Sequence, residues 1–476
     1  MTHATNHLVF RLLLLLVGGT QPYLYAAPTD SLGDLHLPSQ PGRFWLPPPN
    51  PAPLNKRQST PAELRFNSLA ELSEYALEHR PESRAAWMSI QAEAARLDVA
   101  RAANWPTVTG QFNITHSQAL SSSGASVPVL TRYGPSLSLS YVLADFGARS
   151  AGIDAQRYQL IAALLNNNRR LQDGVAAVEA AYFAWHASRA QVLAFQQQET
   201  SLNASLEAVT LRLNTGLVAR ADQLRARAAL TEAELARASA ERDGVKAEAA
   251  LKQAAGIPQT TRLHLDWPSP PQNADETHLA LADLLDEALR QRPDLQALQA
   301  ATASARAEAD RAHAARWPTV SLSANTGRTS FLEDNRDTTT SYGVGVNLSV
   351  PLFDGGRLRG LARAAERDAD RLQAEESVQA NTVTREVADA YHDTRYAQTQ
   401  STRIRDLLAA ASESAQAAQA RYQAGVGSLL ELLTAQADLA RARQTAAQSE
   451  SDWLAAFSRL SYALGRVPVT STSSPP

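Results

Sequence analysis

An internal duplication constrains this chain more than any other feature of its sequence. Residues 69–108 match residues 281–320 at 17 of 40 positions, and both copies end in the tetrapeptide WPTV. Further matches, such as Gly216 with Gly425 and Gly256 with Gly465, all lie 209 residues apart. The spacing thus falls from 212 to 209 between the two sets, a net loss of three residues in the second copy, and self-similarity held over so long a stretch is the signature of a repeated structural unit. The sequence therefore predicts two copies of one arrangement of helices and strands.

Each copy changes its hydrophobic period twice. It begins with a short helix, a proline and a long Ala-rich helix, which lead into WPTV. Apolar and small polar residues then alternate, which is the period of a β-strand with one apolar face. This pattern predicts β-hairpins at about residues 106–143 and 318–352, with strands of roughly ten residues. The strands are followed by the related elements LADFGAR and LFDGGR, after which a helical period returns.

The helical part of each copy predicts a very long helix, a tight turn and a returning helix. Leu171, Val178 and Trp185 share one seven-residue register, which is typical of a coiled coil. We expect helices over 148–212 and 222–255 in the first copy, and near 358–422 and 429–464 in the second, with turns at Gly216 and Gly425. A helix over 148–212 would be about 100 Å long at ~1.5 Å per residue.

The two ends of the chain suggest export and flexible segments. A basic residue, a short apolar run and a small-residue site predict a signal peptide over residues 1–27; a transmembrane anchor is the alternative, but the run is well under the ~20 residues that a span needs. Residues 28–62 form a Pro-rich flexible arm. The first repeat then covers 63–258, a linker 259–280, the second repeat 281–468 and a disordered tail 469–476.

Composition excludes several classes of function. The net charge of −3 gives no reason to expect a nucleic-acid partner, and the absence of Cys excludes disulfides and thiolate sites. The chain has no P-loop, G-x-S-x-G or H-E-x-x-H motif and no cluster of His. We therefore expect neither enzymatic activity nor a cofactor or bound metal.

The strands have the length and alternation of membrane-spanning β-strands. Four strands cannot close a barrel, and an open sheet edge in lipid leaves backbone groups unpaired. Two chains would give eight strands with a filled interior, whereas three would give twelve strands and room for a lumen. The polar face of Ser, Thr, Gly and Asn would line water, which favours three chains. The alternative is that soluble hairpins cap a helical bundle.

At the level of motifs, the chain resembles the TolC family of outer-membrane channels. The duplicated WPTV, the junctions SYVLADFGAR and SVPLFDGGRLRG, and the turns RLNTGLVARADQLRARA and RYQAGVGSLLELLTAQADLARAR carry this resemblance. It covers residues 69–468 and implies a mixed α/β membrane protein. In this fold, a homotrimer builds a 12-stranded β-barrel in outer-membrane lipid and a long α-helical coiled-coil tunnel in the periplasm.

The resemblance also implies roles for residues at the tunnel tip. Asp222 and Tyr422 match positions that latch the closed tip, and Glu431 matches an acidic constriction ring. Capping or a solvated helix face is the alternative for all three. The chain departs from the family pattern at Ala221, Gly427 and Thr434, where a Thr, a latching Arg and a second acidic ring are expected. The turn residues expected to dock an adaptor are Gly216, Leu217, Val218, Gly425, Val426 and Gly427.

Further positions mark where each copy passes between helix and strand. Pro106 and Pro318 are expected to stop the Ala-rich helices. Trp105 and Trp317 are expected either at the membrane–water boundary or buried at the junction. At the strand-to-helix junctions, Asp145 with Gly147 and Asp354 with Gly356 are expected to order the turn, with the carboxylates as N-caps rather than ligands.

Taken together, these features predict a passive export channel. The resemblance is strongest to channels of type I secretion that export an RTX toxin of the adenylate cyclase-haemolysin type. It implies a periplasmic adaptor (a membrane fusion protein), an inner-membrane ABC transporter and a transiting toxin as partners. The absence of a lipid-bearing Cys favours this role over small-molecule efflux, which remains the alternative. A soluble periplasmic coiled-coil scaffold is a third possibility.

Overall fold

The duplication is visible in the order and length of the elements. The computed structural model describes residues 62–118, 129–265, 280–332 and 337–466. The expected signal peptide, the tail and all but the last residue of the Pro-rich arm lie outside these ranges. The first copy contains α2 (Leu69–His79), α3 (Pro81–Ala102), β2 (Thr107–Ser117), β3 (Leu130–Ala144), α4 (Ala148–Asn214) and α5 (Arg220–Ala254). The second contains α6 (Leu281–Gln291), α7 (Pro293–Ala314), β5 (Thr319–Phe331), β6 (Thr339–Ser349), α8 (Arg357–Gln423) and α9 (Leu429–Ala463).

The predicted long helices are confirmed, and their lengths agree between copies. Helices α4 and α8 have 67 residues each, and α5 and α9 have 35 each. At ~1.5 Å per residue the longer pair extends about 100 Å. Among the described residues, no helix combines the length and the hydropathy that crossing a membrane requires.

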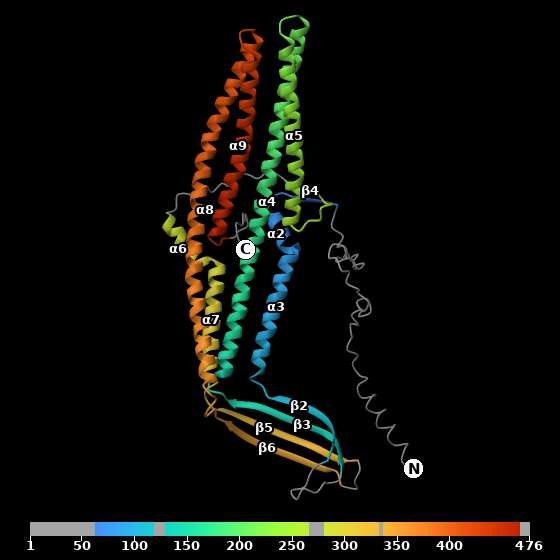
Figure 1. Ribbon diagram of the computed structural model, residues 1–476, viewed down its shortest axis with the longest axis vertical. Coiled ribbons are helices and arrows are strands. Elements are labelled where there is room, and N and C mark those ends of the chain that lie inside the picture. Colours follow the sequence, from blue (N-terminus) through green and yellow to red (C-terminus); the bar gives the residue numbers. More distant parts are fainter. Residues whose placement is uncertain (1–61, 119–128, 266–279, 333–336, 467–476) are drawn as a thin grey trace, which may run out of the picture. The chain divides into compact units, whose positions relative to one another are not determined.

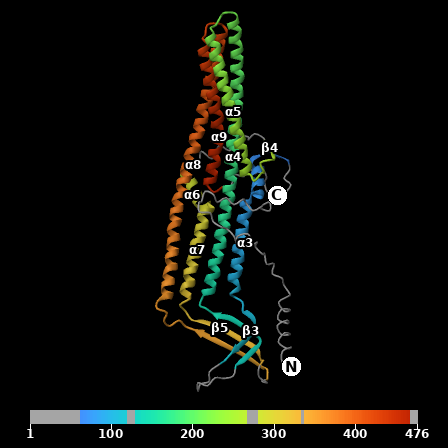
Figure 2. The same ribbon diagram turned by 45° about the vertical axis from the view of Figure 1, so that its right-hand side comes forward.

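Each long helix has different neighbours along its two halves. Toward the strands α4 packs against α3 and α7, and toward the opposite end it packs against α5 and α9. Helix α8 packs likewise against α7 and α9. Both views show the four strands at one end of the helices and the α4–α5 and α8–α9 turns at the other (Figures 1 and 2). The helical hairpins therefore carry their turns far from the sheet.

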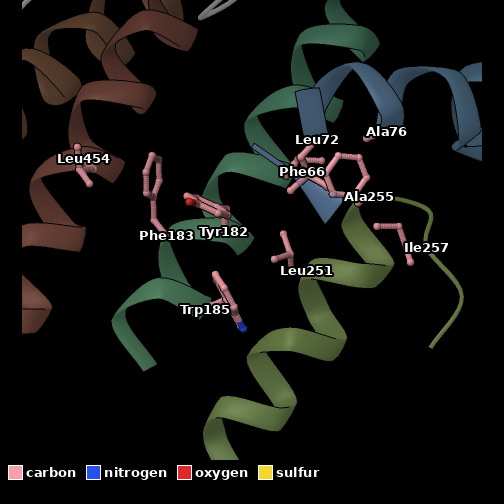
Figure 3. Packing of buried hydrophobic residues seen from close by; sticks show 11 residues of the cluster. Phe66, Leu72, Ala76, Tyr182, Phe183, Trp185, Leu251, Ala255, Ile257 and Leu454 are labelled. Atoms are coloured by element: carbon pink, nitrogen blue, oxygen red, sulfur yellow. The ribbon is translucent and has the colours of Figure 1, made fainter. Parts of the chain in front are cut away.

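The apolar core lies where the short helices meet the long ones. In the first copy Leu72 from α2, Val178 from α4 and Leu251 from α5 are completely buried in one cluster. Figure 3 shows Tyr182 and Trp185 of α4 beside Leu251, with Phe66 near Leu72. A second cluster around Leu284, Val383, Val387 and Leu460 repeats this arrangement in the second copy. The register Val178–Trp185 predicted as a coiled-coil seam is thus buried.

The two β-hairpins join into one antiparallel sheet of order β2-β3-β5-β6. Register places Val108, Leu139, Ala324 and Val344 in one row across the sheet. The adjacent row, on the other face, is Thr109, Ser138, Asn325 and Gly343. The predicted separation of an apolar from a small polar face is therefore confirmed, and it continues across both copies.

One small sheet was not predicted. Strand β1 (Glu63–Phe66) pairs in parallel with β4 (Arg262–Leu265), so part of the expected linker 259–280 is a strand. Four residues are too few for an alternating pattern to be recognised against the surrounding chain. The pairing ties the start of the first repeat to the segment that follows α5.

A seam of polar contacts joins α4 of the first copy to α9 of the second and to the residues just after it. Gln172 donates to the carbonyl of Gly465 at 2.6 Å, Ser458 donates to the Glu179 carboxylate, and His186 bonds Ser451 at 3.1 Å. These α4 residues are seven apart, as expected for one stripe of a coiled coil. Glu179 and His186 are only 4% and 5% exposed. Burial raises the pKa of Glu179 to about 7, against the opposing effect of the Ser458 hydrogen bond.

The raised pKa of Glu179 predicts a pH dependence of stability. The unfolded chain loses the Glu179 proton near the ordinary pKa of 4.5, whereas the folded chain keeps it until about pH 7. The contribution of this group to the free energy of unfolding is therefore fully present below about pH 4.5. It decreases as pH rises and is lost as pH passes through about 7. Burial lowers the pKa of His186, which acts in the opposite direction. We therefore compare wild type with Glu179→Gln by thermal unfolding at several pH values.

The variant is expected to gain stability relative to wild type as pH rises from about 5 to about 8. Glu207→Gln, at an exposed position on the same helix, is the matched control and should follow the wild-type curve. A constant difference between Glu179→Gln and wild type over this range would contradict the prediction.

Candidate functional site at the ends of the hairpins

Both helical hairpins turn through the same glycine motif. In the first, the Leu217 N–H bonds the Arg212 carbonyl at 2.9 Å and the Gly216 N–H bonds the Leu213 carbonyl at 2.9 Å. In the second, Val426 and Gly425 make the corresponding bonds at 3.0 and 3.1 Å. Gly216 and Gly425 have φ of +75° and +78°, a conformation that favours glycine. This is a Schellman ending, and it confirms the predicted turns at Gly216 and Gly425. Both turns lie at the end of the helices away from the sheet, which we call the tip (Figure 1).

The residues after these glycines differ between the two turns. Leu217 and Val426 are 75% and 70% exposed, so both present apolar side chains to solvent at the tip. Val218 instead packs against a buried cluster below the turn. A side chain at its counterpart Gly427 would be crowded, because a Cβ there would lie 3.0 Å from the Arg421 Cβ and 3.1 Å from the Tyr422 N. The family Arg is therefore absent at a position that lies close to the last turn of α8.

The implied latch between Asp222 and Tyr422 is not formed in this chain. Tyr422 is 5% exposed and packs with Val209 and Ala226 of the first hairpin. Its hydroxyl has no hydrogen-bond partner within the described chain. Asp222 instead pairs with Arg225, one turn along its own helix, at 3.5 Å. The two residues lie on neighbouring hairpins, but their polar groups do not meet.

Glu431 lies in the first turn of α9, at the tip of the second hairpin. Its backbone N–H is capped by the Ser428 hydroxyl at 3.1 Å. Its carboxylate pairs with Arg421 of α8 at 3.1 Å, across the turn. Sequence reasoning missed Arg421 and its counterpart Arg212, although both occupy the same position in the duplicated turn. The presence of an Arg at this position in both copies was the sequence signal that could have identified the two residues.

The aspartates at the strand-to-helix junctions bond the first helical turn. Asp145 accepts from the backbone N–H of Arg149 at 2.9 Å, and Asp354 accepts from those of Gly356 and Leu358 at 2.9 and 2.7 Å. The Leu358 bond is the main cause that lowers the pKa of Asp354. Gly147 and Gly356 occupy the N-cap positions themselves, in left-handed conformations. The carboxylates therefore order the turn from two residues before the cap.

The tryptophans at the helix-to-strand junctions are exposed in this chain. Trp105 and Trp317 are 75% and 61% exposed, so the expectation of burial within the chain is wrong. Helices α3 and α7 end at Ala102 and Ala314, a few residues before Pro106 and Pro318, which precede the strands. The prolines therefore lie beyond the last helical turn and lead into the strands, instead of ending the helices themselves.

An aromatic residue beside Trp317 adopts an unfavourable backbone conformation. Phe146 has φ of +51°, and its ring lies 6.2 Å from that of Trp317. Its counterpart in the second copy is Gly355, with φ of +67°. A bulky residue in this region costs of order 1 kcal/mol or more relative to glycine. The first copy keeps an exposed ring at this junction despite that cost.

Sequence comparisons relate this chain to known proteins. The family model described as outer membrane efflux protein matches residues 72–257 and 284–466. Protein CyaE of Bordetella pertussis is 34% identical over 388 residues, covering 79% of this chain and 79% of that protein. The solvent efflux pump outer membrane protein SrpC of Pseudomonas putida is 27% identical over 410 residues, covering 84% and 85%.

Solved structures share the fold of this chain. A membrane protein from Pseudomonas aeruginosa superimposes with a TM-score of 0.74 at 25% identity, covering 83% of this chain and 92% of the other. The open state of the Neisseria gonorrhoeae MtrE outer membrane channel superimposes with a TM-score of 0.70 at 20% identity, covering 85% and 91%. The chain therefore belongs to the outer membrane efflux protein family, the TolC family of outer-membrane channels that its duplicated motifs resemble.

Proposed function

We propose that three copies of this chain form a 12-stranded barrel in the outer membrane, continued by a helical tunnel in the periplasm. The observation that carries this proposal is the four-stranded sheet, in which β2 and β6 each have one neighbour within the described residues. Unpaired edges in lipid cost several kcal/mol per group, whereas neighbouring copies would pair them. The exposed Val344, Val346 and Leu348 on one face suit lipid, and the small polar rows suit a water-filled lumen.

The channel is a passive duct of a type I secretion system, without catalytic chemistry of its own. It exports a protein toxin of the RTX, adenylate cyclase-haemolysin type, and an inner-membrane ABC transporter supplies the energy through a periplasmic adaptor. The 34% identity with CyaE supports this role over the alternative. The exposed Leu217 and Val426 at the tip offer an apolar surface to the adaptor. Neither a nucleic acid nor a cofactor takes part.

The alternative is the outer-membrane channel of a small-molecule efflux pump. Relatives named as solvent and toluene efflux pump proteins, at 27% identity over 410 residues, favour it. Both roles use the same duct and differ in the inner-membrane partner and the cargo. A soluble periplasmic scaffold is the least supported role, because it leaves the exposed apolar face of the sheet in water.

A channel predicts ion conductance by the purified protein. We expect detergent-extracted protein to come from the outer-membrane fraction, to run as a trimer on unheated gels and to form stepwise pores in planar lipid bilayers. A soluble monomer without pores would contradict the channel and support the scaffold.

If the cargo is a protein toxin, loss of this chain should affect toxin secretion and not solvent tolerance. Deleting its gene in the native cell should abolish secretion of an RTX-type toxin into the medium while the minimum inhibitory concentrations of solvents and antibiotics stay unchanged. Complementation with the wild-type gene is the control. Loss of solvent tolerance with normal toxin secretion would instead establish the efflux role.

The position of Glu431 predicts an effect on ion selectivity. If its three copies constrict the tip, Glu431→Gln removes three negative charges from the narrowest point and should reduce the preference for cations over anions. The reversal potential in a salt gradient measures this preference. Glu413→Gln, an exposed change on α8 ten or so residues from the tip, is the control. An unchanged reversal potential for Glu431→Gln would remove this residue from the constriction.

A further inference from the structure

The duplication leaves an arginine at the same position of each hairpin turn, and the two make different contacts. Arg421 pairs with Glu431 of its own hairpin at 3.1 Å. Arg212 reaches the other hairpin: its guanidinium lies 4.5 Å from the centre of the Tyr422 ring, and its Nη2 donates to the Gln423 carbonyl at 3.0 Å. Arg421 thus links the two helices of its own hairpin, whereas Arg212 links the first hairpin to the second.

A nearby substitution explains why Arg212 is available for the other hairpin. The counterpart of Glu431 is Asp222, which pairs with Arg225 instead of Arg212. In the second copy the position equivalent to Arg225 is Thr434, which offers Glu431 no charge. Glu431 therefore recruits Arg421, whereas Asp222 is already neutralised within its own helix. The different partners of the two arginines thus accompany the change from Arg225 to Thr434.

The contacts of Arg212 suit the end of α8. The last carbonyls of a helix lack partners inside it, and Arg212 supplies a donor to that of Gln423. The positive charge also lies near the C-termini of α4 and α8, where helix dipoles favour cations. The Tyr422 ring presents its face to this charge, as in a cation–π contact. The buried Tyr422 hydroxyl takes no part, since it has no partner within the described chain.

Arg212 makes the polar contact between the hairpins that is nearest to the tip. The next one is Gln436 of α9, whose amide donates to Ser201 and Ser205 of α4, both at 3.0 Å. Ser205 lies seven residues before Arg212, or about 10 Å along the helix. Over that last stretch, the described chain links the two hairpins by Arg212 and apolar packing around Tyr422.

We propose that Arg212 is the latch that holds the two hairpins of one protomer together at the tip, through the face of the Tyr422 ring and the Gln423 carbonyl. Tyr422 then acts through its ring and not its hydroxyl, and Asp222 is not its partner. This inference rests on the proposed channel function, in which separation of the hairpins opens the tip.

The test compares four forms of the full-length protein in planar bilayers: wild type, Arg212→Ala, Arg220→Ala and Tyr422→Phe. Arg212→Ala should raise the ratio of open to closed channels about tenfold, equivalent to about 1.4 kcal/mol. Arg220→Ala removes an exposed arginine beside the first turn as a matched control and should leave this ratio unchanged. Tyr422→Phe keeps the ring and should also match wild type.

A second readout does not need a pore. The chain has no Cys, so spin labels at Leu217→Cys and Val426→Cys report the separation of the two turns. Arg212→Ala should lengthen this distance, and Arg220→Ala and Tyr422→Phe should not. If wild type forms no pores, the channel proposal fails, but the label distances still decide the latch.

Two outcomes would overturn the latch. The first is an Arg212→Ala protein whose conductance and label distance equal those of wild type. The second is a Tyr422→Phe protein that opens as far as Arg212→Ala, because the hydroxyl would then be the group that holds the hairpins.

Discussion

Contact between the two copies along α4 and β3 is the interaction on which the rest of the structure depends. Strand β3 pairs with β5, and α4 packs against α7 and α9, so the first copy meets the second over the sheet and the whole helical region. Without this contact each copy would be an isolated hairpin on two long helices, and isolated two-stranded hairpins are marginal in water. The shared sheet, the buried seam and the paired turns all follow from it.

The architecture could be predicted from the sequence because each element has a pattern within its own residues and because the duplication shows each pattern a second time. Period-two alternation marks the strands, heptad spacing marks the helices, and glycines that need a positive φ mark the turns at Gly216 and Gly425. The helix ends fall within a few residues of those predicted. Pairing β3 with β5 extends the alternation of both hairpins into one sheet, since their apolar rows align.

What the sequence did not reveal depends on contacts between distant side chains. The β1–β4 pair is too short for a period, and the exposure of Trp105 depends on what packs nearby. Family resemblance predicted a bond between Asp222 and Tyr422, but Arg225 takes the carboxylate. A motif preserves the backbone position of a residue, whereas its partner is set by neighbours that vary independently. Equivalent positions of the duplicated turns could have pointed to Arg212 and Arg421.

Equal helix lengths in the two copies have a consequence for how such a chain can change over generations. Helices α4 and α8 have 67 residues each, and α5 and α9 have 35 each. Adding one heptad to α4 alone would carry its turn about 10 Å beyond that of α8 and leave the added residues without neighbours. The added heptad would keep the contact stripe in phase, but beyond the insertion each residue of α4 would face a position of α9 one heptad away from its present partner unless α9 gained a heptad at the same level. The reach of the hairpins therefore changes only through matched insertions in all four helices, so variation in length within such a lineage should be rare and should come in steps of whole heptads.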